Sequence, residues 1–139
     1  MSLSVFLKGN RRTKENIFYA VSDNFEVDGK PVDWEIKAIS AKEDEILRES
    51  CTKKVPVPGK KGVTVPETDL NAYIGKMATN CIVFPNLNDV ELQNSYGVMG
   101  AENLLKEMLT PGEYTKLITK IQEHNGFENF EEKVEEAKN

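Results

Sequence analysis

Apolar and polar residues alternate along residues 17–38, a period of two that is typical of strands with one buried face. The first run places Ile17, Tyr19, Val21, Phe25 and Val27 on one face, and the second aligns Val32, Trp34, Ile36 and Ala38. An Asp28-Gly29 turn separates the two runs, so they are predicted to pair as a β-hairpin. Because an isolated hairpin is marginally stable, its apolar face is expected to pack on helices or further strands.

A helix is predicted to follow the hairpin, because Ser40 and Glu43 have the spacing of a capping box. In such a box the serine hydroxyl accepts a hydrogen bond from the Glu43 amide, and the Glu43 carboxylate accepts one from the Ser40 amide. The helix is expected to run to about Cys51, with Ile46 and Leu47 facing inward.

Residues 52–66 interrupt the helical pattern. Three prolines and two glycines exclude a helix there, and spaced valines favour a second, irregular hairpin with a lysine-rich, solvated tip. Beyond it, residues 67–83 have apolar positions three or four apart, so they are predicted to form a long amphipathic helix that ends before Pro85.

Residues 81–127 carry the most specific pattern, a series of capped helices separated by glycine and proline. Three helices are predicted: one capped by Asn88, with a Leu87–Leu92 staple and an end at Gly97; one over residues 101–109; and one that begins with the Thr110–Glu113 capping box and ends at Asn125-Gly126. Residues 129–139 are predicted to be a last amphipathic helix. These elements predict an α+β fold, in which an N-terminal β-hairpin packs on a mainly helical C-terminal two-thirds.

The length of 139 residues favours a single domain over residues 1–139. The N-terminal segment 1–14 and the C-terminal helix 129–139 are interpreted as arms that can move. The net charge of −5 argues against nucleic-acid binding, so the basic segments 8–14 and 53–61 are interpreted as solvated. No apolar run is long enough for a signal segment or a membrane span, so a cytoplasmic protein without a membrane partner is expected.

Reactive side chains are few, and no familiar catalytic spacing connects them. His124 is the only histidine, and Cys51 and Cys81 lie 30 residues apart. A nucleophile pair of either cysteine with His124 stays open as an alternative, but no third group is spaced to orient the histidine. We favour His124 as a structural polar residue in the last turn of a helix, where the helix dipole favours a cation, and Cys81 as a core thiol. Zinc, calcium and phosphate-loop spacings are missing from the sequence, so neither an enzyme nor a cofactor is predicted.

Tyr96, Val98 and Met99 are apolar residues in a predicted interhelical loop. They either fill the core or line a groove that takes a helix of a partner protein. Methionine and aromatic side chains are ordinarily buried, which favours the core, but the sequence leaves both interpretations open.

Seven sequence segments occur in this order along the chain: DGKPVDWEIKAIS, CTKK, CIVFPNL, ELQNSYGVMGAENLL, MLTPGEYTKL, HNGF and VEEAKN. In these segments the chain resembles the XkdN-like phage tail assembly chaperones, and the resemblance covers about residues 3–139. Those proteins come from contractile-tailed phages and defective prophages of Gram-positive bacteria. The basic segment 8–14 and the loop 53–66 are the least distinctive parts of the resemblance.

The resemblance implies a non-enzymatic protein that binds the long, mostly helical tape measure protein and helps tail tube subunits polymerise around it. The tape measure protein is thus the expected partner and the tail tube protein a second one. Self-association is also expected, since such proteins coat a long partner in many copies. The predicted partner-binding residues are Tyr96, Val98, Met99, Leu104, Leu105, Met108, Phe130 and Val134. The alternative is a structural tail or baseplate accessory protein of the virion.

Overall fold

The structure is a computed structural model that describes residues 2–127. Its elements in chain order are η1 (Leu3–Phe6), η2 (Lys8–Asn10), β1 (Ile17–Tyr19), β2 (Glu26–Val27), β3 (Lys30–Pro31), β4 (Trp34–Ile36), α1 (Ala41–Ser50), β5 (Thr52–Pro56), β6 (Thr64–Thr68), α2 (Leu70–Cys81), β7 (Ile82–Phe84), α3 (Val90–Ser95), α4 (Ala101–Met108) and α5 (Pro111–His124). The fold is α+β, as the sequence predicts, and most strands lie in the N-terminal half. The predicted helix 129–139, with Phe130 and Val134, lies outside the described residues.

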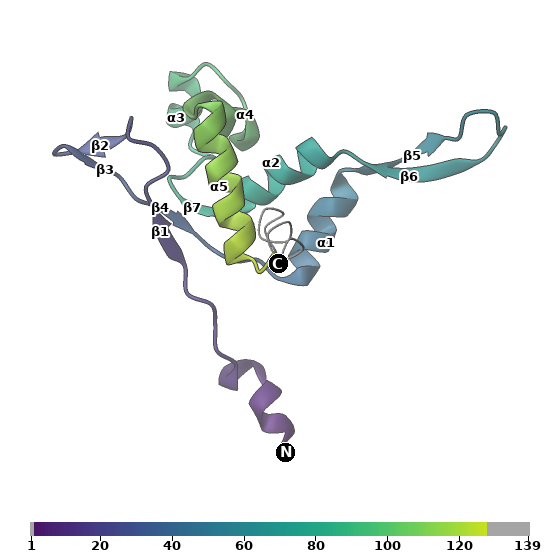
Figure 1. Ribbon diagram of the computed structural model, residues 1–139, viewed down its shortest axis with the longest axis horizontal. Helices are drawn as coiled ribbons and strands as arrows, with labels where there is room; N and C mark the ends of the chain where they lie inside the picture. The colour runs from purple at the N-terminus through teal and green to yellow at the C-terminus, as the bar shows by residue number, and fades with distance from the viewer. Residues whose placement is uncertain (1, 128–139) are drawn as a thin grey trace, which may run out of the picture.

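A small antiparallel sheet with the strand order β1-β4-β7 forms one side of the body (Figure 1). Tyr19 of β1 lies opposite Trp34 of β4, and Ile36 of β4 lies opposite Ile82 of β7. The chain between β1 and β4 makes the short β2–β3 hairpin at the predicted Asp-Gly turn. The N-terminal hairpin is therefore confirmed, but as two short strand pairs joined to a third strand, β7, from farther along the chain.

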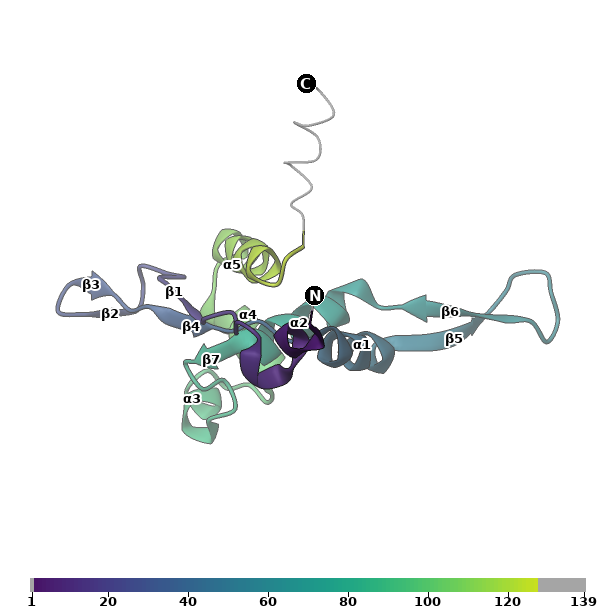
Figure 2. The same cartoon turned by 90° about the horizontal axis from the view of Figure 1, so that it is seen from below.

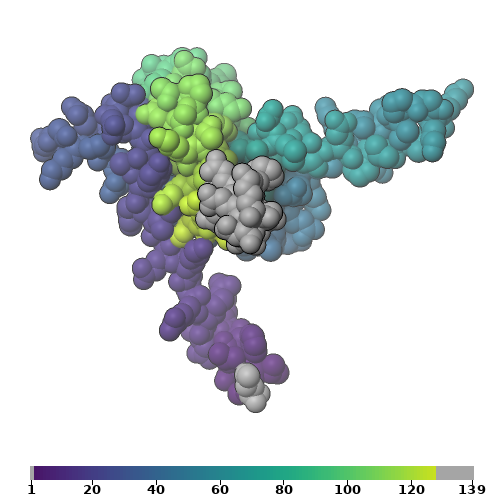
Figure 3. Space-filling model, viewed as in Figure 1, coloured from purple at the N-terminus to yellow at the C-terminus, as the bar shows by residue number. Residues whose placement is uncertain are grey.

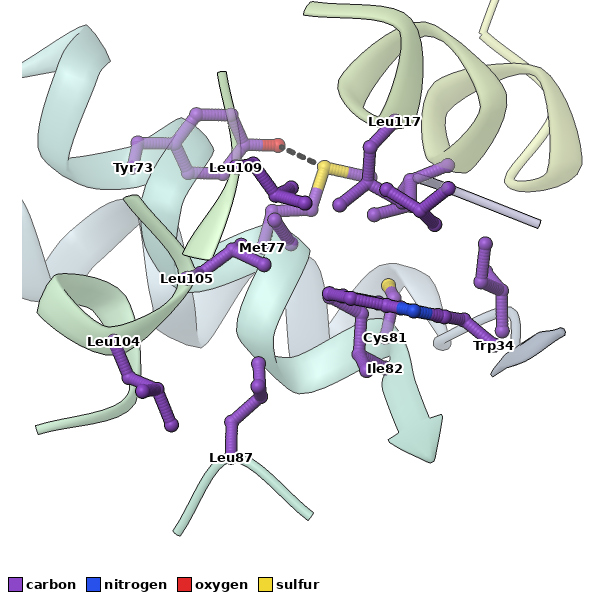
Figure 4. Packing of buried hydrophobic residues seen from close by; sticks show 14 residues of the cluster. Trp34, Tyr73, Met77, Cys81, Ile82, Leu87, Leu104, Leu105, Leu109 and Leu117 are labelled. Atoms are coloured by element: carbon purple, nitrogen blue, oxygen red, sulfur yellow. Dashed lines mark hydrogen bonds between the residues drawn. The ribbon is translucent and has the colours of Figure 1, made fainter. Parts of the chain in front are cut away.

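Helix α2 lies at the centre of the body, in contact with α1, α4, α5 and β7. One face of α2 is buried, through Tyr73, Met77, Ala78 and Cys81 (Figure 4). The most deeply buried large side chains of the same core are Trp34, Ile36, Leu104, Leu105, Leu117 and Ile121. These side chains come from the sheet, α4 and α5, so the apolar surface that drives folding converges on one helix.

The contact between α1 and α2 is polar at its centre. The Tyr73 hydroxyl donates a hydrogen bond to the Asp44 carboxylate, and the Arg48 guanidinium lies 4.4 Å from the centre of the Tyr73 ring. Burial, followed by the bond to Asp44, raises the pKa of Tyr73 to about 12. The phenol therefore keeps its proton and remains a donor at neutral pH, which fixes α1 to the body although all α1 side chains are at least partly exposed.

Asn125 connects the end of α5 to two other parts of the core. Its Oδ1 accepts a hydrogen bond of 2.8 Å from the backbone amide of Ile39, in the connection between β4 and α1. Its Nδ2 donates to the Ile121 carbonyl at 2.8 Å and lies 3.6 Å from the Cys81 sulfur. Both the donor and the acceptor of this amide side chain are thus satisfied by separate segments.

Most of the predicted helix ends are confirmed. Ser40 and Thr110 each form a complete capping box with the glutamate three residues later. Gly97 and Gly126 have φ angles of 66° and 85°, and each follows its helix in a Schellman motif. Because L side chains are strained at such positive φ angles, these two positions favour glycine.

The predicted helix over residues 67–83 is wrong at both ends. Helix α2 begins only at Leu70, because the Asp69 carboxylate caps it by accepting a hydrogen bond from the Ala72 amide, and the two preceding residues belong to β6. Residues Ile82–Phe84 leave the helix and pair with β4 instead. β-Branched and aromatic residues directly before Pro85 favour an extended backbone, and the apolar periodicity concealed this change.

Three smaller expectations are also wrong. The cap of α3 is Asp89 and not Asn88, since the Asp89 carboxylate accepts the hydrogen bond from the Leu92 amide at 2.8 Å. Ile46 is 54% exposed, because α1 turns Leu47 toward the core in its place. Val27 is 64% exposed, because the β2–β3 hairpin projects beyond the helices (Figure 1).

Two further segments project from the body (Figures 1 and 3). The first is the β5–β6 hairpin, which confirms the second hairpin of the sequence and extends in the opposite direction from β2–β3 (Figure 2). The second is the N-terminal arm, defined as residues 2–10, which contains η1 and η2 and is joined to β1 by an extended linker. Helical structure in this arm is thus limited to two short 3₁₀ turns.

Replacing Asn125 with alanine should lower the free energy of unfolding by about 1–3 kcal/mol, because the Ile39 amide would lose its acceptor in a partly buried place. Urea unfolding at pH 7.5 measures this effect. Asn94, an exposed asparagine of α3, provides the matched control Asn94→Ala, which should change stability little. Equal losses in the two variants would contradict the bridging role of Asn125.

The cap of α3 can be tested with two neighbouring substitutions. Asp89→Ala should lower the free energy of unfolding by about 1 kcal/mol, because the first turn of α3 loses its side-chain acceptor. Asn88→Ala should have a much smaller effect. The melting temperatures of the two variants give the comparison. A larger decrease in melting temperature for Asn88→Ala than for Asp89→Ala would identify Asn88 as the cap.

Candidate protein-binding groove

An apolar groove of about 340 Å³ lies where the sheet meets α3 and α4. Its lining residues are Phe25, Val32, Trp34, Phe84, Pro85, Leu92, Ser95, Tyr96 and Met108. They come from the β1–β4 connection, β4, the end of β7, α3 and α4. The groove therefore exists only in the folded chain, because its walls come from segments far apart in the sequence.

Aromatic rings form most of the floor and one wall of this groove. The rings of Phe25 and Trp34 are 6.4 Å apart and tilted at 49°, within the usual range for paired aromatic side chains. Trp34 is only 2% exposed, whereas Phe84 at the rim is 53% exposed. A buried aromatic floor with an accessible aromatic rim is the composition found at the anchor points of protein interfaces.

Gln93 fixes the turn after α3, which carries the lining residue Tyr96. Its Nε2 donates to the Leu87 carbonyl at 2.9 Å, and its Oε1 accepts a hydrogen bond from the Gly100 amide at 3.0 Å. The Gln93 carbonyl also accepts from the Val98 amide at 3.1 Å. The turn that carries Tyr96 is thus fixed at both ends, and sequence reasoning did not identify Gln93 because glutamine gives no capping signal at this position.

The structure separates the predicted partner-binding residues into three places. Tyr96 and Met108 line the groove, and both also pack against the core. Val98 is half-buried against the core, and Met99 is 86% exposed beside it. Leu104 and Leu105 are 0% and 1% exposed and belong to the core, so they present no surface to a partner.

Sequence reasoning also missed half of the groove. Trp34 and Phe25 were identified only as strand residues, and Phe84, between the predicted helix 67–83 and Pro85, was assigned no role. The sequence did contain one signal for the groove, which is the aromatic residues in the segments that flank Pro85 and the Asp-Gly turn. The aromatic residues alone could not show that these two segments are in contact, because β4 and β7 are separated by more than 40 residues in the sequence.

The groove lining carries no charged side chain among the described residues. The charged residues next in the sequence to a lining residue are all acidic: Glu26, Asp33, Glu35, Glu91 and Glu107. Neighbours on a strand point to opposite faces, so Glu35 faces away from Trp34, and its carboxylate accepts a hydrogen bond from the Asn16 side chain. The groove therefore offers apolar contact rather than charge.

The titratable side chains considered for catalysis are not assembled in this groove. Cys81 is fully buried, and burial raises its pKa to about 11, so it remains a protonated thiol. His124 is 8% exposed, and its Nε2 lacks a hydrogen-bond partner among the described residues. Burial first, and then Lys14 and Lys120, lower the pKa of His124. His124 thus lies in the last turn of α5, as predicted, but as a buried side chain whose environment favours the neutral form.

Residues 2–127 form neither a metal-binding cluster nor a membrane-spanning helix. No group of three or more histidine, cysteine, aspartate or glutamate side chains in that part of the chain could hold a metal ion. Among the helices described there, none is sufficiently long and apolar to cross a bilayer.

The family described as phage XkdN-like tail assembly chaperone protein matches residues 3–138. The chain belongs to the XkdN-like phage tail assembly chaperones. Two relatives from Bacillus subtilis (strain 168) match over nearly their whole length. An uncharacterized protein, YqbN, is 31% identical and covers 97% of this chain and 91% of its own. The phage-like element PBSX protein XkdN is 29% identical and covers 99% of this chain and 93% of its own.

A solved structure supports the fold of this XkdN-like chaperone. The crystal structure of a protein named YqbN superposes with a TM-score of 0.76 at 24% identity, over 92% of this chain and 98% of the other. The family gives the protein a role in phage tail assembly. Such a role implies protein partners in the tail and a non-enzymatic activity.

The stability of this XkdN-like chaperone should depend on the protonation of His124. Because the folded state lowers the pKa of His124, the unfolded chain takes up the proton first as the pH falls below about 6.5. The contribution to stability is complete above that value and is lost as the pH falls toward the folded pKa. The change in free energy of unfolding between pH 7.5 and 5.5 should therefore be smaller in His124→Gln than in the wild type. Urea unfolding at both pH values measures it, and identical pH dependence would contradict this assignment.

Proposed function

We propose that this chaperone binds the tape measure protein of its phage in the apolar groove, keeps that protein soluble and assists tail tube assembly by protein–protein contacts. It would act in the cytoplasm of the host cell, with the tail tube protein as a second partner. The observation that carries the proposal is the groove itself, an aromatic-lined surface on a member of a tail assembly chaperone family.

The chemistry of the groove defines the segment that it would bind. Phe84 and Tyr96 offer aromatic surfaces above the buried Trp34, and Met108 offers a side chain that adapts to different shapes. An amphipathic helix can place apolar residues three and four positions apart into such a groove. We therefore propose that the bound segments are helices with an apolar stripe.

Co-expression with the tape measure protein of the same phage tests this proposal. Phe84→Ser removes an exposed aromatic ring from the rim, and it should raise the Kd for the tape measure protein at least about tenfold, since burying a phenylalanine is worth about 1.5–3 kcal/mol. The readouts are the soluble fraction of the tape measure protein and its co-purification.

Phe18→Ser is the matched control. Phe18 is 64% exposed on β1 and does not line the groove, so its replacement should leave recovery of the tape measure protein unchanged. Equal recovery with both variants, at wild-type melting temperatures, would refute the groove as the binding site. Finding the chain in purified particles, with no effect on tape measure solubility, would support a structural virion component instead.

A further inference from the structure

A second pocket, of about 440 Å³, lies at the end of α5. Its walls come from three segments: the basic linker, defined as residues 11–14, the start of α1 and the last turn of α5. The hydrogen bond between the Ile39 amide and the Asn125 side chain holds the start of α1 beside the end of α5 (Figure 1). Within the described chain, the lining of this pocket shares no residue with the lining of the apolar groove, so the two sites are separate.

Positive charge dominates the lining of this pocket. Arg11, Arg12 and Lys14 all line it, and their side chains are exposed and therefore accessible. Glu43 is the one acid in the lining, and its Oε1 already lies 3.5 Å from the Ser40 amide and 3.3 Å from the Ser40 hydroxyl in the capping box of α1. Cations that surround one cavity focus a positive potential into it and attract an anion.

The start of α1 adds to this positive potential. Ser40, which lines the pocket, caps this helix of ten residues by accepting a hydrogen bond from the Glu43 amide at 3.1 Å. The other backbone amides of a first helical turn have no acceptor within the helix, and the helix dipole places a partial positive charge there. The start of a helix therefore favours an anion when other groups also hold that anion.

His124 provides an independent sign of a ligand. Its ring is 8% exposed and forms part of the pocket wall, and its buried Nε2 makes no hydrogen bond within the described chain. A buried polar atom without a partner is uncommon in folded proteins, and a water or an ion can supply the missing partner. Burial, followed by Lys14 of the linker and Lys120 of α5, lowers the pKa of His124, so the ring lies in a positive potential that an anion would offset.

We propose that this pocket binds an oxyanion, a carboxylate or a phosphate, between the cations of the basic linker, the start of α1 and the imidazole of His124. The linker supplies three of the charges and the body supplies the other donors, so the bound anion fastens the linker to the body. It thereby fixes the direction in which the N-terminal arm projects. The site does not depend on the proposed function, because the apolar groove takes no part in it.

Two sources can supply the oxyanion. Residues 128–139, which lie outside the described residues, contain five glutamates and follow Gly126 of the pocket lining almost directly in the chain. A covalent tether of this kind gives their carboxylates a high effective concentration at the pocket. A free phosphate in solution is the other source.

Limited cleavage of the full chain by trypsin tests the pocket, because trypsin cuts after lysine and arginine. Sulfate is the probe, since its charge does not change between pH 7.5 and 5.5, and chloride at equal ionic strength is the control. Near-saturating sulfate should slow cleavage after Arg11, Arg12 and Lys14 at least about fivefold, because the cleavable state falls by the factor 1 + [sulfate]/Kd. Cleavage after Lys60 and Lys61, at the tip of the β5–β6 hairpin, should keep its rate, and mass spectrometry assigns each site.

Two double variants with the same change in charge separate the pocket from general electrostatics. Arg12→Gln with Lys14→Gln removes two cations of the lining at exposed positions, so the melting temperature should stay that of the wild type. The Kd for sulfate, measured from cleavage after Arg11, should rise at least about tenfold, as expected for loss of two charge-assisted hydrogen bonds. Lys60→Gln with Lys61→Gln should keep the Kd of the wild type. Equal protection by sulfate in the two double variants would overturn the site.

The role of His124 gives the binding a distinct pH dependence. Protection by sulfate should strengthen as the pH falls from 7.5 to 5.5, because a protonated imidazole can donate a hydrogen bond to the anion. The charged groups around the ring are Lys14 of the linker, Lys120 of α5 and Glu43 of α1, and none of these titrates between the two pH values at its usual pKa. His124→Gln should therefore remove the pH dependence, and its persistence in a folded variant would overturn the part assigned to the imidazole.

A variant with glutamine in place of all five glutamates of residues 128–139 distinguishes the two sources of the oxyanion. If those carboxylates occupy the pocket, the linker of this variant is cleaved faster than that of the wild type without sulfate, and sulfate restores the protection. If a free anion is the ligand, the two chains are cleaved alike without sulfate and are protected alike by it. Both results support the oxyanion site. Sulfate without effect on the linker in either chain would overturn it.

Discussion

Burial of one face of α2 holds the other parts of the body together. Tyr73, Met77 and Cys81 bring the sheet, α1, α4 and α5 onto a single helix, and Asn125 completes the arrangement by linking the last helix to the β4–α1 connection. The groove depends on this arrangement, because one wall comes from the sheet and the other from α3 and α4. A stable width for the groove therefore requires a stable position for α2.

The proposed activity uses surfaces that this core leaves uncovered. The groove is apolar and lies between the sheet and the helices α3 and α4. The net negative charge of the chain would keep its complex with an apolar partner soluble. Helix α4 contributes to both the core and the groove, since Leu104 and Leu105 are buried in the core while Met108 lines the groove.

Local signals in the sequence were sufficient for most of the fold. The capping boxes at Ser40 and Thr110 and the glycine at 97 define helix ends through contacts within a few residues, and these were predicted correctly. Ile82–Phe84 were predicted wrongly because their strand exists only through pairing with β4, a distant segment. The groove was only half predicted for the same reason: Tyr96 was identified from its loop, but Trp34 could be placed beside it only by tertiary structure.

Trp34 is the only tryptophan of the chain and lies in the groove, so its fluorescence reports directly on the central claim. The measurement is a titration of the wild-type chaperone with tryptophan-free tape measure peptides that carry an apolar helical stripe. Binding in the groove predicts a saturable change in Trp34 emission that Phe84→Ser shifts to at least about tenfold higher peptide concentration. Peptide binding detected by calorimetry, with Trp34 emission unchanged and with equal affinity for Phe84→Ser, would contradict the account.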